Sequence, residues 1–162
     1  MSSTSSKLLL KIPHCKQESD HSCLPACIKM VLSYFGVQKR EQEIRSLLKT
    51  RPAGTNPLNV VRLRKWNLEA SVTFSNLEEL KSYLIQKKPP IVLLWSGKLS
   101  YWDSNEYLDF LHAVVVIGYD DEMIVVNDPA FDDSPKTVQV YEFLEAWSYS
   151  QQMLILIEKA PS

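Results

Sequence analysis

The sequence predicts a single α+β domain, because helical periodicity dominates its first half and strand patterns dominate its second half. The chain has 162 residues, 45% of them hydrophobic, which suffices for one core without a metal or a disulfide. We assign residues 1–9 to a disordered or poorly ordered tail and residues 10–160 to the domain. Helices are expected over 23–35, 41–49, 56–66, 76–87 and 140–147, and strands over 8–12, 70–74, 91–95, 111–119, 123–127 and 153–158.

The first helix carries the strongest local signals. It is expected to open at Ser22 or Cys23, with Pro25 in the first turn, where the missing N–H of proline costs no hydrogen bond. Apolar residues then recur at intervals of three and four, and Gly36 stands where a glycine commonly ends a helix. We therefore expect a buried helix with Cys23 at its start.

The second half of the chain is typical of an antiparallel hairpin. The apolar stretch Leu111–Tyr119 is followed by a tight acidic turn, and Met123–Asn127 returns beside it. Asp128-Pro129 ends the hairpin. Residues 96–110 and 130–137 are expected to be loops, and the aromatic residues from Trp95 to Tyr107 are expected to flank a cleft.

The charge balance gives no reason to expect a nucleic acid as partner. The chain has 18 Lys and Arg against 19 Asp and Glu, and it lacks the concentrated basic face that phosphate binding needs. No stretch is long and apolar enough for a membrane span, and no secretory signal opens the chain. Because three cysteines do not suit a disulfide framework, we interpret the sequence as a cytoplasmic protein with free thiols.

One of the three thiols occupies a position that favours nucleophilic chemistry. The unpaired N–H groups and the dipole of a helix N-terminus stabilise a thiolate, and Cys23 stands at such an end. Cys27 lies one turn further along on the apolar face, where cysteine behaves as a small hydrophobe, and Cys15 lies in the preceding loop. Position therefore selects Cys23.

A base and its orienting partner are available in the hairpin. His112 opens an otherwise apolar strand, where it is either a structural core histidine or the base for Cys23. Asn127 or Asp128, at the end of the returning strand, can accept a hydrogen bond from His112 Nδ1–H. Gln17, six positions before Cys23, can bring an amide beside the thiol and complete an oxyanion site with the Cys23 N–H.

These residues resemble a known family. The stretch from Gln17 to Gly36 (QESDHSCLPACIKMVLSYFG), together with LHAVVVIGYDDEMIVVNDPAF from Leu111, is similar to the papain-like cysteine peptidases that process bacteriocin leader peptides after a double-glycine motif. The resemblance covers about residues 10–158. It implies a papain-like fold, in which N-terminal helices pack on a C-terminal antiparallel sheet and the nucleophile stands at a helix start.

The resemblance also implies residue roles and a substrate class. Gln17 becomes the oxyanion donor, Cys23 the nucleophile, His112 the general base and acid, and Asp128 its orienting partner. A peptide or protein is the expected substrate, and no cofactor is implied. Members of the family are often fused to ABC transporters, so association with a separate transporter is a further expectation. Leu24 stands where the family commonly has glycine, which is expected to crowd the leaving-group side.

Three other functions stay open from the residues alone. The same nucleophile could serve acyl transfer or the hydrolysis of a non-peptide amide, and the fold could act as an inactive peptide-binding module. The third alternative is a zinc site, since soft ligands cluster near the first helix, although they lack the paired spacing of a zinc finger. Those ligands are His14, Cys15, His21, Cys23 and Cys27.

Overall fold

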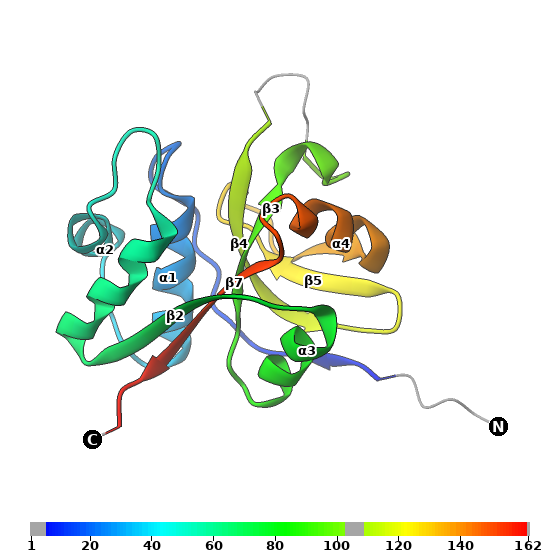
Figure 1. Cartoon of the computed structure of the whole chain (residues 1–162), viewed down its shortest axis with the longest axis horizontal. Helices are drawn as coiled ribbons and strands as arrows, with labels where there is room; N and C mark the ends of the chain where they lie inside the picture. The colour runs from blue at the N-terminus through cyan, green and yellow to red at the C-terminus, as the bar shows by residue number, and fades with distance from the viewer. Residues whose placement is uncertain (1–5, 103–108, 162) are drawn as a thin grey trace.

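The computed structural model describes residues 6–102 and 109–161, which form one antiparallel sheet with helices on both faces (Figure 1). Within the described residues the strand order is β2-β7-β3-β4-β5-β6, with β1 paired to β4. The strands are β1 (Leu8–Leu9), β2 (Leu68–Phe74), β3 (Ile91–Trp95), β4 (Leu111–Tyr119), β5 (Met123–Asn127), β6 (Lys136–Gln139) and β7 (Met153–Lys159). The helices are α1 (Cys23–Tyr34), α2 (Glu41–Leu48), α3 (Leu77–Ile85) and α4 (Val140–Ser148), with the 3-10 helices η1 (Pro57–Trp66) and η2 (Ser96–Lys98).

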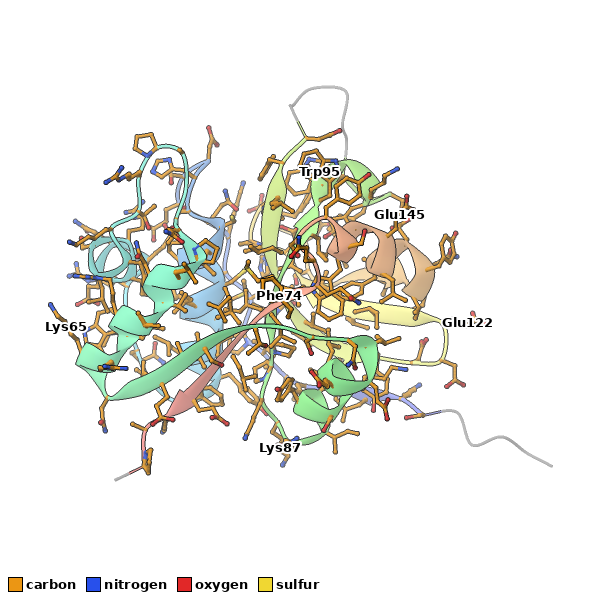
Figure 2. All side chains as sticks on the ribbon, in the orientation of Figure 1. Lys65, Phe74, Lys87, Trp95, Glu122 and Glu145 are labelled. Atoms are coloured by element: carbon orange, nitrogen blue, oxygen red, sulfur yellow. The ribbon has the colours of Figure 1, made fainter. Side chains whose placement is uncertain are left out.

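Strand β4 is the centre of the sheet and carries the residues that separate its two faces. Alternate side chains of a strand point to opposite faces, so Ala113 and Val115 pack with α1 and α2, whereas Val114 and Val116 pack with α3 and α4. Figure 1 shows α1, α2 and η1 on one side of the sheet and α4 on the other. Side chains fill the space between the layers (Figure 2). The fold is therefore two hydrophobic cores that share one sheet.

Helix α1 begins and ends where its sequence signals predict. Cys23 is its first residue, and Pro25 lies in the first turn. Gly36 adopts a φ of +81°, a left-handed conformation that residues with a Cβ rarely adopt, and the Val37 N–H donates to the Leu32 carbonyl at 2.8 Å to close the helix. The buried face of α1 runs from Leu24 to Leu32 and fixes Cys23 at the edge of the sheet.

Hairpin β4–β5 also matches its predicted bounds, and its register determines which residues meet. Val115 pairs with Asn127 and Val116 with Val126, before a bulge shifts the register towards the turn. Because the strands are antiparallel, the start of β4 lies beside the end of β5. The sequence therefore brings His112 and Asp128 to the same edge of the sheet.

The structure corrects three details of the predicted elements. Residues 57–66 form a 3-10 helix rather than an α-helix, with the Asn56 side chain accepting from Leu58 N–H. Residues 136–139, of which 136 and 137 were expected to lie in a loop, pair with β5 as β6, and Val138 is buried. Leu8–Leu9 were assigned both to the end of the tail and to a strand over 8–12, and they form the short strand β1 against β4. A Cβ on Gly118 would lie 2.4 Å from the Leu8 carbonyl oxygen.

No helix in the described part of the chain is both long enough and apolar enough to cross a membrane.

Candidate active site

Cys23 occupies the N-terminus of α1 and faces the first residues of β4. The Ser22 hydroxyl accepts from Ser19 N–H at 3.1 Å, so the preceding side chain is engaged with the loop rather than with the helix. The backbone N–H groups of Leu24 and Ala113 interact with the Cys23 sulfur. The thiol is thus surrounded by donors from the helix and from the strand.

His112 and Asp128 form a fully buried pair beside this thiol. Asp128 Oδ1 lies 2.5 Å from His112 Nε2, and both side chains have no exposed surface. This corrects the predicted use of Nδ1: the strand orients the imidazole so that Nε2 faces the carboxylate. Nδ1 is left on the side of Cys23. It is buried and has no hydrogen-bond partner among the described residues. Cys–His contacts are often loose in unliganded enzymes and tighten around the substrate.

Asp128, rather than Asn127, is the residue that meets the imidazole. The Asn127 amide donates to the Ile12 carbonyl at 3.1 Å, and its oxygen accepts from the Ser134 hydroxyl at 2.6 Å. Asn127 therefore ties the N-terminal segment and the 130–135 loop to β5. Sequence reasoning left both residues open, and the pleat of β5 separates them by pointing neighbouring side chains to opposite faces.

Electrostatics favours a charged Cys23–His112 pair. Burial by itself lowers the pKa of His112, but the charge of Asp128, its hydrogen bond and the interaction with Cys23 together raise the pKa to about 10. Burial likewise raises the pKa of the Cys23 thiol, but the proximity and charge of His112 and the two backbone N–H groups outweigh it, so the pKa falls below its usual 9.0. A thiolate facing an imidazolium is the state that attacks carbonyl carbon.

The other two thiols lie in environments of the opposite kind. Cys27 is fully buried in the core, and desolvation, with the nearby charges of Cys23 and Asp128, raises its pKa well above 9.0. Cys15 is half-buried with its thiol 3.6 Å from the Ala26 carbonyl oxygen, and burial raises its pKa as well. Among the three thiols, only Cys23, which the sequence selected by position, has a lowered pKa.

Gln17 lies in the segment before α1, and its amide is engaged with the backbone of that segment. Its backbone N–H donates to the Pro129 carbonyl at 2.7 Å, which ties this segment to the Asp128-Pro129 turn. Its side-chain NH₂ donates to the Ser19 carbonyl at 2.7 Å. Its Oε1 is buried and has no hydrogen-bond partner among the described residues. The amide is thus near the site and incompletely satisfied there.

A buried carboxylate on α2 holds the same segment. Glu41 is 1% exposed, and its two oxygens accept from Glu18 N–H at 3.1 and 3.3 Å. Arg45, one turn along α2, lies 3.5 Å from the carboxylate. Burial raises the pKa of Glu41, although the Glu18 N–H and Arg45 favour its charged form. Sequence analysis missed this residue, because a Glu in the first turn of an amphipathic helix is ordinary.

Aromatic side chains pack around the His112 imidazole. Trp102 and Phe110 lie 4.7 and 5.6 Å from the imidazole by ring centroids, and Phe131 packs edge-on against Trp102 at 5.1 Å. The stretch from Trp95 was expected to flank a cleft, and of it residues 103–107 lie outside the described part of the chain. Trp95, labelled in Figure 2, ends β3 and pairs with Leu111, and the preceding Leu94 pairs with His112.

Tyr101 is a site residue that sequence reasoning did not identify. Its hydroxyl donates to Asp128 Oδ2 at 2.8 Å. On the other side of the turn, His14 Nε2 lies 2.9 Å from the Asp128 carbonyl oxygen. No motif marks a tyrosine in a polar, aromatic segment as the partner of a distant aspartate, so only the folded chain reveals it.

The described residues contain no group of three or more His, Cys, Asp or Glu side chains arranged to hold a metal ion. The residues around α1 that were considered as zinc ligands instead lie apart, in the core, in the loop before α1 and beside His112.

Comparisons with known proteins identify the family and the fold of the chain. The Peptidase C39 family matches residues 11–162. Comparison with curated protein sequences gave no match. Among solved structures, a C39-like peptidase from Bacillus anthracis is 18% identical with a TM-score of 0.78, covering 97% of this chain and 100% of that one. The peptidase domain of Streptococcus ComA, a bi-functional ABC transporter, is 22% identical with a TM-score of 0.72, covering 94% and 100%.

A third structure carries a bound peptide. It is a double-glycine motif protease from an AMS/PCAT transporter in complex with the leader peptide, 22% identical with a TM-score of 0.71, and 94% of each chain is covered. At these identities the structural likeness establishes the fold, which is papain-like with mixed helices and antiparallel sheet.

Proposed function

The chain belongs to the Peptidase C39 family and is a cysteine peptidase, and we propose that Cys23, His112 and Asp128 form its catalytic triad. The observation that carries this proposal is the buried His112–Asp128 pair beside a thiol at a helix N-terminus, with the thiol pKa lowered and the imidazole pKa raised. A structural ion pair in the core would not need a thiolate beside it.

The first half of the reaction forms an acyl-enzyme. The Cys23 thiolate attacks the carbonyl carbon of the scissile bond, and the carbonyl π electrons move onto oxygen. His112 then gives its proton to the leaving amine as the tetrahedral intermediate collapses and the C–N bond breaks. Asp128 holds the imidazole and stabilises its charge, as the orienting carboxylate does in such triads. Burial of the pair excludes water from the proton that His112 transfers.

The second half releases the acid product. A water molecule gives a proton to His112 and attacks the thioester carbon. The Cys23 thiolate leaves, which regenerates the ion pair. In both halves the oxyanion accepts from the Cys23 backbone N–H and from Gln17. The Gln17 amide reaches this position by leaving the Ser19 carbonyl, and its unsatisfied Oε1 lowers the cost of that rotation.

The substrate we propose is a peptide with small residues before the cleaved bond, such as a leader peptide. The support is the family and the solved double-glycine protease that holds a leader peptide. Buried Leu24 and the aromatic side chains around His112 restrict the space near the thiol, which suits small residues. Association with a separate transporter protein is also part of the proposal, and its support is that the similar ComA peptidase domain belongs to an ABC transporter.

A peptide-library cleavage screen tests the reaction, with Cys23→Ala as the inactive control. We expect cleavage by the wild type alone, after small residues. Addition of a primary amine separates hydrolysis from acyl transfer, because a transferase would yield the amide of that amine. Absence of cleavage of every library peptide, with Cys23 no more reactive than Cys15, would overturn the proposal.

Labelling with iodoacetamide tests the nucleophile without any substrate. Cys23 is expected to react fastest near neutral pH, and Cys27 is expected to be protected by complete burial. Mass spectrometry of the three cysteine peptides gives each rate separately. Equal rates at all three thiols would contradict the assignment.

A further inference from the structure

Asp128 is bound by more donors than a triad requires. Its Oδ1 accepts from His112 Nε2 and from the Ala130 N–H at 2.9 Å, and its Oδ2 accepts from the Tyr101 hydroxyl at 2.8 Å. The first two contacts come from the hairpin and its turn, which are adjacent in sequence. Tyr101 alone comes from a distant segment, after η2, and the proposed mechanism does not use it.

The Tyr101 hydroxyl is held in place by packing on its ring. The ring meets Phe131 edge-on at 5.5 Å, and Lys136 Nζ lies 5.7 Å from its centroid. Desolvation and the adjacent Asp128 charge raise the pKa of Tyr101 well above 10.0. The hydroxyl therefore keeps its proton and donates at every pH at which the enzyme works.

We propose that Tyr101 is a positioning residue of the reaction: it fixes the Asp128 carboxylate and, by sharing its negative charge, sets the basicity of His112. The inference rests on the proposed triad. A carboxylate anchored only through Oδ1 can rotate about its Cβ–Cγ bond, whereas a bond to each oxygen prevents that rotation. A donor on Oδ2 also withdraws charge from the oxygen that faces His112, so the imidazolium is stabilised less strongly.

Groups from several elements face this assembly and titrate or carry charge. They are His14 before α1, Cys23 and Cys27 of α1, Lys136 of β6, and Glu142 of α4. Replacing tyrosine by phenylalanine leaves all of them in place, so the change isolates the hydroxyl.

Tyr101→Phe is the test, and Tyr141→Phe, at a tyrosine that is 71% exposed, is its matched control. In Tyr101→Phe we expect kcat to fall about tenfold with KM nearly unchanged, because substrate does not touch this hydroxyl. The pKa of His112, followed by NMR of its imidazole, is expected to rise by about half a pH unit, since one of three donors to the carboxylate is lost. A packing effect alone would lower kcat without raising that pKa.

A double-mutant cycle with Asp128→Asn tests whether Tyr101 acts through Asp128. In the Asp128→Asn background, Tyr101→Phe is expected to change kcat less than twofold. Full additivity of the two losses, or an unchanged His112 pKa in Tyr101→Phe, would overturn the inference. A Tyr101→Phe protein with wild-type kcat would overturn it too.

The rate of Cys23 alkylation separates this inference from the proposed triad. If Asp128→Asn alters the pH dependence of alkylation and Tyr101→Phe does not, the triad stands and the role of Tyr101 fails. If neither His112→Ala nor Asp128→Asn alters that dependence, the triad itself fails.

Discussion

The two halves of the site differ in how completely they are assembled. On the hairpin side, His112 and Asp128 are buried and joined, and backbone pairing between β4 and β5 sets their positions. On the loop side, Gln17 donates to Ser19, and Glu41 secures its segment through side-chain bonds. Strand register builds the acid–base half in advance, whereas the oxyanion half depends on one amide that must turn. We therefore expect any substitution in the acid–base half to lower activity. In the oxyanion half, the position of the Gln17 amide is expected to depend on whether substrate is bound.

Loss of the base gives the largest expected effect. His112→Ala removes the imidazolium that lowers the Cys23 pKa, so thiolate is lost near neutral pH together with the proton donor. We expect kcat/KM to fall on the order of a thousandfold or more. Steady-state kinetics and alkylation rates should fall together. A variant that keeps fast alkylation would show that helix α1 alone activates the thiol.

Loss of the loop amide gives the next effect and tests the proposed rotation. Gln17→Ala is expected to lower kcat on the order of a hundredfold, with the alkylation rate of Cys23 unchanged, because the amide acts only on the oxyanion. Gln38→Ala, at an exposed glutamine, is the control. If Gln17→Ala slows alkylation as strongly as cleavage, the amide supports the thiolate rather than the oxyanion.

The segment that carries Gln17 can be loosened without touching the site. Glu41→Ala leaves the Glu18 N–H and Arg45 without their buried partner, which should lower the free energy of unfolding by about 1–3 kcal/mol. We expect kcat to fall about tenfold because Gln17 is less well placed. Urea denaturation and kinetics measure the two effects, with Glu69→Ala at an exposed position as the control. Loss of stability with full activity would show that Glu41 stabilises the fold without positioning the Gln17 amide.

The pH dependence of stability gives the smallest effect. The raised pKa of His112 contributes stability that is fully present below pH 6.5 and is lost as the pH rises towards about 10. The lowered pKa of Cys23 contributes stability that is present above pH 9.0 and is lost as the pH falls below it. The two contributions oppose each other between these pH values, so the net dependence of stability on pH is expected to be small there.

Replacing the thiol removes the opposing contribution. In Cys23→Ala only the contribution of His112 remains, and it is lost as the pH rises. Stability relative to the wild type should then decrease as the pH rises towards 9.0. Urea denaturation at several pH values measures this slope. Parallel curves for the two proteins would mean that Cys23 and His112 are both neutral in the native state.

Much of the hairpin half could be predicted because strand patterns are local. The alternation and turn of residues 111–127 predict a hairpin, and antiparallel pairing then requires His112 and Asp128 to share an edge. The start of α1 was equally predictable from Pro25 and the apolar spacing that follows. The ring nitrogen that faces Asp128 was predicted wrongly, because it depends on the side-chain angle of His112 and not on its position.

The sequence by itself determined the family, the α+β fold, and the placement of Cys23, His112 and Asp128 at two predictable element ends. Those features follow from short-range periodicity and motif spacing. Only the tertiary structure decided that Tyr101 binds Asp128, that Glu41 holds the Gln17 segment, and that the Gln17 amide rests on Ser19. Such contacts join segments far apart in the chain, and each depends on the burial and orientation of single side chains. No local pattern encodes them, because their energies arise only when the cores on both faces of the sheet have closed.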